Sequence, residues 1–232
     1  GLDGGISENK RGFETLFPMF ADIGISAQGF FSQSLKEVTI KVCGKLISAF
    51  VGDMFGPLFH GNFCSPVSLL IRRDLWDRMG GFDETFRIAE ETEFFHRLAG
   101  MAPGAIVMAP LIRVRQGHES IISSGNTIRL IQNALVSIDR AVRSRNVLTS
   151  REQAAYKEGR QRLLARLAWA HLTNLEGKES RTAISAMSPS SRRQLRIAMI
   201  YIASFLPPPI LHILHQSKRL FRKMYAGNRV KP

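Results

Sequence analysis

Cysteine, tryptophan and tyrosine are scarce in this chain of 232 residues: it contains two cysteines, two tryptophans and three tyrosines. The two cysteines, Cys43 and Cys64, have no paired spacing. This excludes a disulfide framework and a cysteine-based zinc site, and it fits a reducing compartment. No segment at the N-terminus resembles a signal peptide, so we expect a cytoplasmic location. The apolar run at 197–206 has ten residues and is too short to span a bilayer.

Acidic residues are also scarce, but only in the second part of the chain. Residues 140–232 contain 19 Lys and Arg against four Asp and Glu, a net charge of +15. Residues 1–139 contain 13 basic against 15 acidic residues, a net charge of −2. The two parts therefore need separate explanations, and the basic part predicts an anionic partner.

Strand and helix signals alternate in the first part of the chain. The expected strands lie in residues 22–31, 37–47, 66–73 and 104–115, and the expected helices in residues 13–20, 73–82 and 90–100. In the first of these helices Pro18 limits the length. Asp74 is expected to cap the start of the second helix, and Gly80 and Gly81 to end it. In the third helix Glu93 and Arg97 are expected to form an i,i+4 ion pair. The alternation predicts an α/β fold, a mixed sheet with flanking helices.

Only helical patterns follow from about residue 126. Apolar residues recur at helical spacing in residues 126–145 and 151–177, where Gly177 is expected to stop a helix. With the segment from residue 181 onward, this predicts four or five helices. The sequence thus divides into an α/β part, residues 1–125, and a basic all-α tail, residues 126–232.

Five carboxylates gather in the eleven positions from 83 to 93, although the chain is basic overall. They are Asp83, Glu84, Glu90, Glu91 and Glu93. A solvated helix face explains part of this cluster. A site that binds a metal or removes a proton explains it better, because a carboxylate held beside other acids is a suitable general base.

The segment around this cluster resembles the second half of the catalytic domain of family 2 glycosyltransferases, which have the GT-A fold. The family pattern begins with a strand that ends in a basic pair, a short helix and then Gly-Gly-Phe-Asp-Glu. An acidic pair at the start of a helix ending in Arg-Leu follows, then a strand pair ending in Pro and an Arg…His…Ser element. Residues 67–120 match this order and spacing, from "SLLIRRDLWDRMGGFDE" to "RVRQGHES".

The resemblance implies a role for each acid of the cluster. Glu91 stands at the position of the general base, where the family usually has Asp, and Glu90 is the other member of the acidic pair. Asp83, Glu84 and Glu93 are implied to shape the acceptor site. The base would take the proton of an acceptor hydroxyl as the hydroxyl attacks the anomeric carbon.

The resemblance also implies a divalent metal, Mg²⁺ or Mn²⁺, that offsets the diphosphate charge of the leaving group. Its implied ligands here are Asp3, in the Gly-rich opening, and His118, in the Arg…His…Ser element. Gly5 stands where the family has a second Asp, and two residues rather than one separate Arg115 from His118. Arg115 is implied to contact a phosphate, while His96 and His60 are expected to be structural.

These observations predict a glycosyltransferase, with inversion at the anomeric carbon, that acts in polysaccharide or glycolipid assembly. The implied substrates are a nucleotide-diphosphate sugar and a saccharide or lipid-linked acceptor. In the family a nucleotide-binding half precedes the metal motif, and the chain begins with Gly1 rather than Met. We therefore expect that half to lie upstream. The alternative is a non-catalytic peripheral membrane or protein-interaction module derived from such an enzyme.

For the basic tail the sequence favours an anionic membrane surface, on the inner face of the cell membrane. Three arginines, Arg192, Arg193 and Arg196, precede the apolar run. Further cations and apolar residues follow it: Leu211, Ile213, Leu214, Lys218, Arg219, Leu220, Phe221, Arg222 and Lys223. No nucleic-acid recognition motif is present, so we expect no nucleic-acid partner. Two alternatives stay open, an ordinary helical subdomain and a basic nucleic-acid binder whose affinity would fall steeply with salt.

Overall fold

The computed structural model describes residues 19–109, 126–207 and 209–211. The chain divides into two compact units: unit 1 takes in residues 1–119 and 136–159, and unit 2 takes in residues 120–135 and 160–232. This division differs from the predicted boundary after residue 125, because the end of one helix and the start of the next belong to unit 1.

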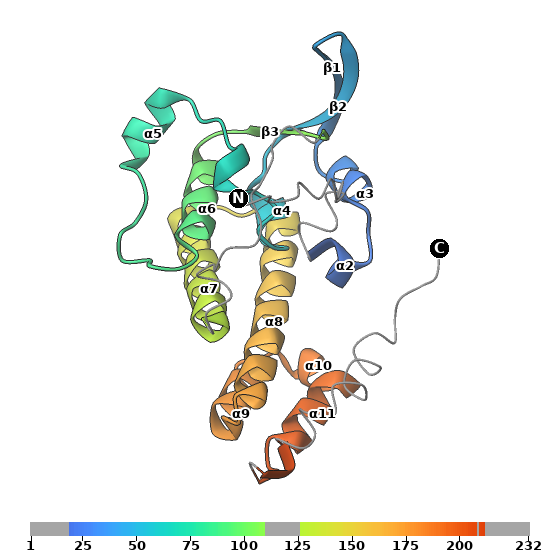
Figure 1. Cartoon of the computed structure of the whole chain (residues 1–232), viewed down its shortest axis with the longest axis vertical. Coiled ribbons are helices and arrows are strands. Elements are labelled where there is room, and N and C mark those ends of the chain that lie inside the picture. Colours follow the sequence, from blue (N-terminus) through green and yellow to red (C-terminus); the bar gives the residue numbers. More distant parts are fainter. Residues whose placement is uncertain (1–18, 110–125, 208, 212–232) are drawn as a thin grey trace, which may run out of the picture. The chain divides into compact units, whose positions relative to one another are not determined.

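Unit 1 combines a small sheet with helices (Figure 1). Its elements in chain order are α2 (Met19–Ile23), α3 (Ala27–Ser32), β1 (Lys36–Val42), β2 (Lys45–Gly52), α4 (Phe55–Leu58), a 3-10 turn (Pro66–Ser68), α5 (Arg73–Met79), α6 (Glu90–Met101) and β3 (Gly104–Val107). The C-terminal part of α7 (Thr127–Ser144) and the N-terminal part of α8 (Ser150–Thr173) complete it. The predicted combination of strands and helices is confirmed.

The sheet of unit 1 has the strand order β1-β2-β3, and both pairings are antiparallel. A mixed sheet is therefore not seen among the described strands. Residues 37–47, predicted as one strand, form a hairpin that turns at Cys43 and Gly44, with φ of 50° and 80°. A two-residue turn with two positive φ angles matches the right-handed twist of the strands. Cys43 is exposed, and both cysteines are free.

Two predicted strands are wrong. Residues 27–32 form helix α3, because the Ser26 side chain accepts a hydrogen bond from the Gly29 amide (3.1 Å) and caps the helix. Residues 66–73 form the 3-10 turn and the start of α5, and Leu70 is 99% exposed instead of buried. Among the described residues, no strand pairs with this short apolar run.

Phenylalanine dominates the core of unit 1. Phe31 lies at its centre, with ring contacts to Phe20, Phe30, Phe50 and Phe63 at centroid distances of 5.1–5.8 Å. Most of these ring pairs are edge-to-face, the arrangement that aromatic quadrupoles favour. A second buried pair, Phe55 and Phe59, packs at 5.0 Å and, through Phe59, contacts Tyr156 of α8 and His96 of α6.

Gly159 allows α8 to approach this core. A Cβ atom at position 159 would overlap the backbone carbonyl of Phe59. We expect Gly159→Ala to destabilise the protein by about 3 kcal/mol in denaturant unfolding, because a backbone carbonyl cannot move aside as a flexible side chain can.

The matched control is Gly100→Ala in α6, where a Cβ atom would lie an ordinary 3.7 Å from the Phe55 ring. That change should be neutral or stabilising, since alanine favours a helix by up to about 1 kcal/mol. If Gly159→Ala and Gly100→Ala changed the free energy of unfolding equally, the close packing at Gly159 would not contribute to stability.

Unit 2 is all helical in the described residues. It contains the remaining parts of α7 and α8 with α9 (Gly177–Ser185), α10 (Pro189–Arg192) and α11 (Leu195–Ala203). Its core includes Ile131, Leu164, Ala168, Ile184, Ile197 and Ile200. The described part of the tail contains the five helices α7–α11, where the sequence predicted four or five for the whole tail.

The predicted stop at Gly177 is wrong. Helix α8 ends at Thr173, Leu175 takes the left-handed φ of 65°, and Gly177 is the first residue of α9. The Glu176 amide donates to the His171 carbonyl (2.9 Å), which closes the turn between the two helices. Within the described residues, no helix has the length and apolar character needed to cross a membrane.

Candidate functional site

The acidic cluster lies on the loop after α5 and the first turn of α6. As predicted, α5 ends at Gly80 and Gly81, both with left-handed φ angles of 73° and 78°. Asp74, predicted as the N-cap of α5, lies instead in its first turn and pairs with Arg72 (2.9 Å). The loop then runs to Ala89, which precedes α6 with a φ of 62°.

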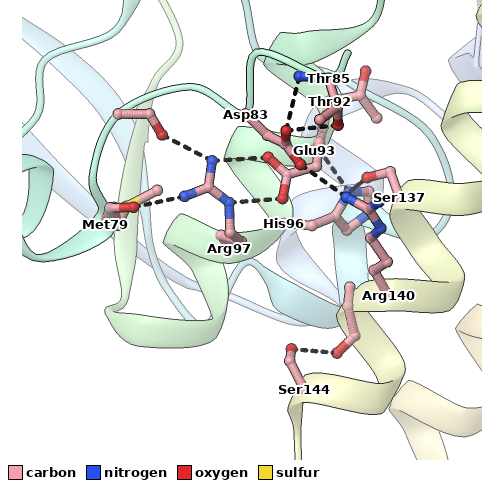
Figure 2. A network of polar contacts seen from close by, with 12 residues as sticks. Met79, Asp83, Thr85, Thr92, Glu93, His96, Arg97, Ser137, Arg140 and Ser144 are labelled. Atoms are coloured by element: carbon pink, nitrogen blue, oxygen red, sulfur yellow. Dashed lines mark hydrogen bonds and ion pairs between the residues drawn. The ribbon is translucent and has the colours of Figure 1, made fainter.

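Glu93 and Arg97 form the structural centre of this region (Figure 2). The predicted i,i+4 pair is confirmed, and it is bidentate: Arg97 Nε and Nη2 donate to Glu93 Oε1 and Oε2 at 2.7 and 2.8 Å. The same guanidinium donates to the carbonyls of Met79 (2.9 Å) and Gly81 (2.8 Å). The Glu93 side chain is 7% exposed. The pair thus fixes the diglycine turn to α6.

Asp83 is held by both the loop and helix α7. Its Oδ1 accepts from the amide and hydroxyl of Thr85 (2.9 and 2.6 Å), and its Oδ2 accepts from Arg140 Nη1 (2.8 Å). The hydrogen bonds from Thr85, followed by the contribution of Arg140, lower the pKa of Asp83. Arg140 also lies over the Phe86 ring, 5.0 Å from its centroid. Asp83 is therefore a fixed anion.

An open hollow of about 310 Å³ adjoins these two carboxylates. It is lined by Met79, Gly80, Gly81, Phe82, Asp83, Glu93 and Arg97. The Phe82 ring is 41% exposed and packs against Trp76 (5.6 Å) and Phe94 (4.7 Å). Carboxylates beside an exposed aromatic ring can meet both the hydroxyls and the C–H face of a polar organic ligand.

Glu91 has a different environment from the other acids. It is half-buried in the first turn of α6, two residues after the left-handed Ala89. Burial raises the pKa of Glu91, its own backbone hydrogen bond lowers it, and the adjacent negative charge of Glu90 raises it further. A left-handed non-glycine residue costs about 1–2 kcal/mol, and such strain is concentrated at functional sites.

The predicted site residues are brought together only in part. Asp83 and Glu93 line the same hollow, whereas Glu90 and Glu91 are in the first turn of α6 and do not line it, and Glu84 is exposed on the loop. The predicted strand end with Arg115, and the predicted metal ligands Asp3 and His118, lie outside the described residues. In the part that is described, no three His, Cys, Asp or Glu residues converge to hold a metal ion.

His96 is structural, as expected, and joins α6 to α7. Its Nδ1 lies 2.8 Å from the Thr92 carbonyl and 3.0 Å from Ser137 Oγ, and its ring stacks on Phe59. The side chain is buried, and its Nε2 makes no hydrogen bond. Burial lowers the pKa of His96 to about 4, although the Thr92 and Leu58 backbone groups oppose this.

We therefore expect acid to weaken unit 1 through His96. The unfolded histidine binds a proton below about pH 6.5, whereas the folded one stays neutral to about pH 4. Above about pH 6.5 the buried neutral His96 therefore causes no loss of stability. As the pH drops to 4, the free energy of unfolding falls by about 3 kcal/mol, because only the unfolded histidine binds a proton. Imidazole NMR should show one histidine neutral at pH 5, and His96→Gln should flatten the stability profile in that range. Titration of His96 near 6.5 would contradict the account.

Arg140, Ser137 and Thr85 were not found from the sequence. Arg140 and Ser137 come from α7, more than 40 positions after their partners Asp83 and His96. Thr85 could have been found, since a threonine two positions after an aspartate commonly closes an Asx-type turn. No family model matches the chain, and no curated protein or solved structure matches it either.

Proposed function

We propose that the protein is an inverting glycosyltransferase that moves a sugar from a nucleotide-diphosphate sugar to a hydroxyl of a saccharide or lipid-linked acceptor. The observation that carries the proposal is Glu91: a half-buried carboxylate with a raised pKa, placed after a strained residue, at the position that resembles the family's general base. The ordered pattern of residues 67–120 supports it.

The chemistry is a single displacement. The acceptor hydroxyl transfers its proton to the Glu91 carboxylate while its oxygen forms a bond to the anomeric carbon. The bond from that carbon to the diphosphate oxygen breaks, and the nucleoside diphosphate leaves with the electron pair. A raised pKa suits this role because a stronger base removes the proton more readily.

The hollow beside Asp83 and Glu93 is proposed to bind a part of the acceptor away from the reacting hydroxyl, because Glu91 does not line it. Asp83 is fixed by Thr85 and Arg140, and Glu93 by Arg97, so neither carboxylate has to be ordered when an acceptor binds. The exposed Phe82 ring offers a flat apolar face for the C–H side of a sugar. A divalent cation held by Asp3 and His118 remains a prediction; when bound it would offset charge on the departing diphosphate.

A donor screen tests the proposal. The full-length gene product is incubated with a panel of nucleotide-diphosphate sugars and with saccharide and lipid-linked acceptors, in Mg²⁺ and in Mn²⁺. We expect nucleoside diphosphate release that depends on an acceptor, and a product heavier by one sugar in mass spectrometry. Absence of turnover with every donor, together with binding to lipid vesicles, would favour the non-catalytic module.

A further inference from the structure

Helix α11 has apolar residues on two opposite sides. Ile197 and Ile200 point into the core of unit 2 and are 1% and 3% exposed. On the other side Leu195, Met199 and Ile202 follow each other at i, i+4 and i+7 and are 77%, 37% and 68% exposed. We call these three residues the outer row. A surface helix normally has a polar outer side, so packing among the described residues of unit 2 does not explain the outer row.

Two aromatic rings extend this apolar surface at the end of α11. Tyr201 and Phe205 are 45% and 60% exposed, and their rings meet edge to face at 5.2 Å. Arg181 lies 4.4 Å from the Phe205 centroid and donates to the Ser204 carbonyl (2.6 Å). The ring of Phe205 is thus fixed at the surface. Aromatic rings with a polar tip, as in tyrosine, favour the boundary between lipid and water.

The charged residues that flank the outer row in the sequence are all arginines. Arg192 and Arg193 are exposed just before α11, and Arg196 is exposed in its first turn. Arg192 also donates to the carbonyls of Met187 (2.9 Å) and Ser185 (2.7 Å), which orders this end of α10. No acidic residue occurs in the sequence after Glu179. The surface therefore combines exposed apolar side chains with exposed arginines.

We propose that the outer row of α11 inserts into the interface of an anionic phospholipid bilayer, with Arg192, Arg193 and Arg196 at the headgroups. The nine residues of α11 rise by about 14 Å, so the helix would lie in the membrane plane. An anionic bilayer matches both the apolar row and the cations. A second copy of the chain would bring the same cations and be repelled. The proposal does not depend on sugar transfer.

Vesicle co-sedimentation of the whole chain tests it. We expect binding to vesicles of phosphatidylcholine with phosphatidylglycerol, weaker binding to phosphatidylcholine alone, and weaker binding at high salt. The double change Leu195→Ser and Ile202→Ser should lower binding to the anionic vesicles about tenfold, because it removes the two most exposed apolar side chains of the row. Arg193→Gln should lower it by a smaller factor.

The matched control changes two apolar residues of unit 1 that are at least as exposed as Leu195 and Ile202. Leu70→Ser with Val147→Ser removes side chains that are 99% and 80% exposed, and binding should stay as in the wild type. Equal loss in both double variants, or equal binding of the wild type to neutral and anionic vesicles, would overturn the proposal. So would a wild-type dimer that becomes monomeric in the outer-row variant, since the row would then contact a second copy.

A dye-labelled variant provides a second test, which does not depend on whether the serine variants fold correctly. Met199→Cys, in a chain whose exposed Cys43 is changed to serine, carries an environment-sensitive dye within the outer row. The dye emission should shift to the blue when anionic vesicles are added, as expected on transfer from water into the lipid interface. An unchanged emission spectrum would contradict insertion of the row.

Discussion

Replacement of Glu91 by glutamine is expected to reduce sugar transfer by the full-length gene product about a thousandfold, while binding of the nucleotide-diphosphate sugar stays unchanged. Glutamine keeps the size of the side chain and most of its contacts, but it cannot accept a proton from the acceptor. The effect should therefore be on kcat rather than on donor affinity, and rapid-quench kinetics with calorimetric donor titration separate the two.

Glu179→Gln is the matched control for this change. Glu179 is also an acid in the first turn of a helix, but it lies in α9 of unit 2 and is exposed. Its neutralisation alters the charge and a helix N-terminus in the same way, so transfer should stay at the wild-type rate. Normal turnover by Glu91→Gln would refute its assignment as the base, whatever the control shows.

Replacement of Glu93 by glutamine is expected to lower the free energy of unfolding by about 3 kcal/mol. The change leaves the Arg97 guanidinium beside the carbonyls of Met79 and Gly81 without its buried counter-charge, and loss of one partner of a buried ion pair commonly costs about 3–5 kcal/mol. The lower end applies because the Arg97 side chain is 31% exposed. Urea unfolding followed by circular dichroism measures the effect.

The control for Glu93 is another i,i+4 pair on a neighbouring helix. Arg73 and Asp77 in α5 lie 3.2 Å apart, but their side chains are 89% and 58% exposed. Asp77→Asn should therefore cost about 0.5 kcal/mol or less, since water screens exposed pairs. If Glu93→Gln and Asp77→Asn lowered the free energy of unfolding by similar amounts, burial would add nothing to the strength of the Glu93–Arg97 ion pair.

The sequence predicted correctly those features that depend on interactions between residues close together in the chain. The diglycine end of α5, the Glu93–Arg97 pair and the alternation of β1 all depend on residues within one or two turns of each other. The strand predicted at 66–73 failed because a strand needs a partner, and an apolar run cannot show whether one exists. The stop predicted at Gly177 failed because a left-handed turn formed at Leu175 instead.

For the candidate site, the sequence indicated the acidic residues but not the residues that hydrogen-bond to them. The density of carboxylates from 83 to 93 and the ordered pattern around them pointed to Glu91 and Asp83. The environment of Asp83 depends on Arg140, which reaches it from α7 across 57 positions. No spacing rule connects residues so far apart. The raised pKa of Glu91 likewise results mainly from burial, and burial is a property of the folded chain.

The most direct test of the account is the dependence of kcat on pH, measured for the wild type and for Glu90→Gln. If Glu91 is the base, the rate falls as the pH drops through its pKa, which burial and Glu90 raise above the ordinary value of 4.5. Removal of the Glu90 charge should then move this acid limb to lower pH while transfer continues. An acid limb that Glu90→Gln leaves in place would contradict the account.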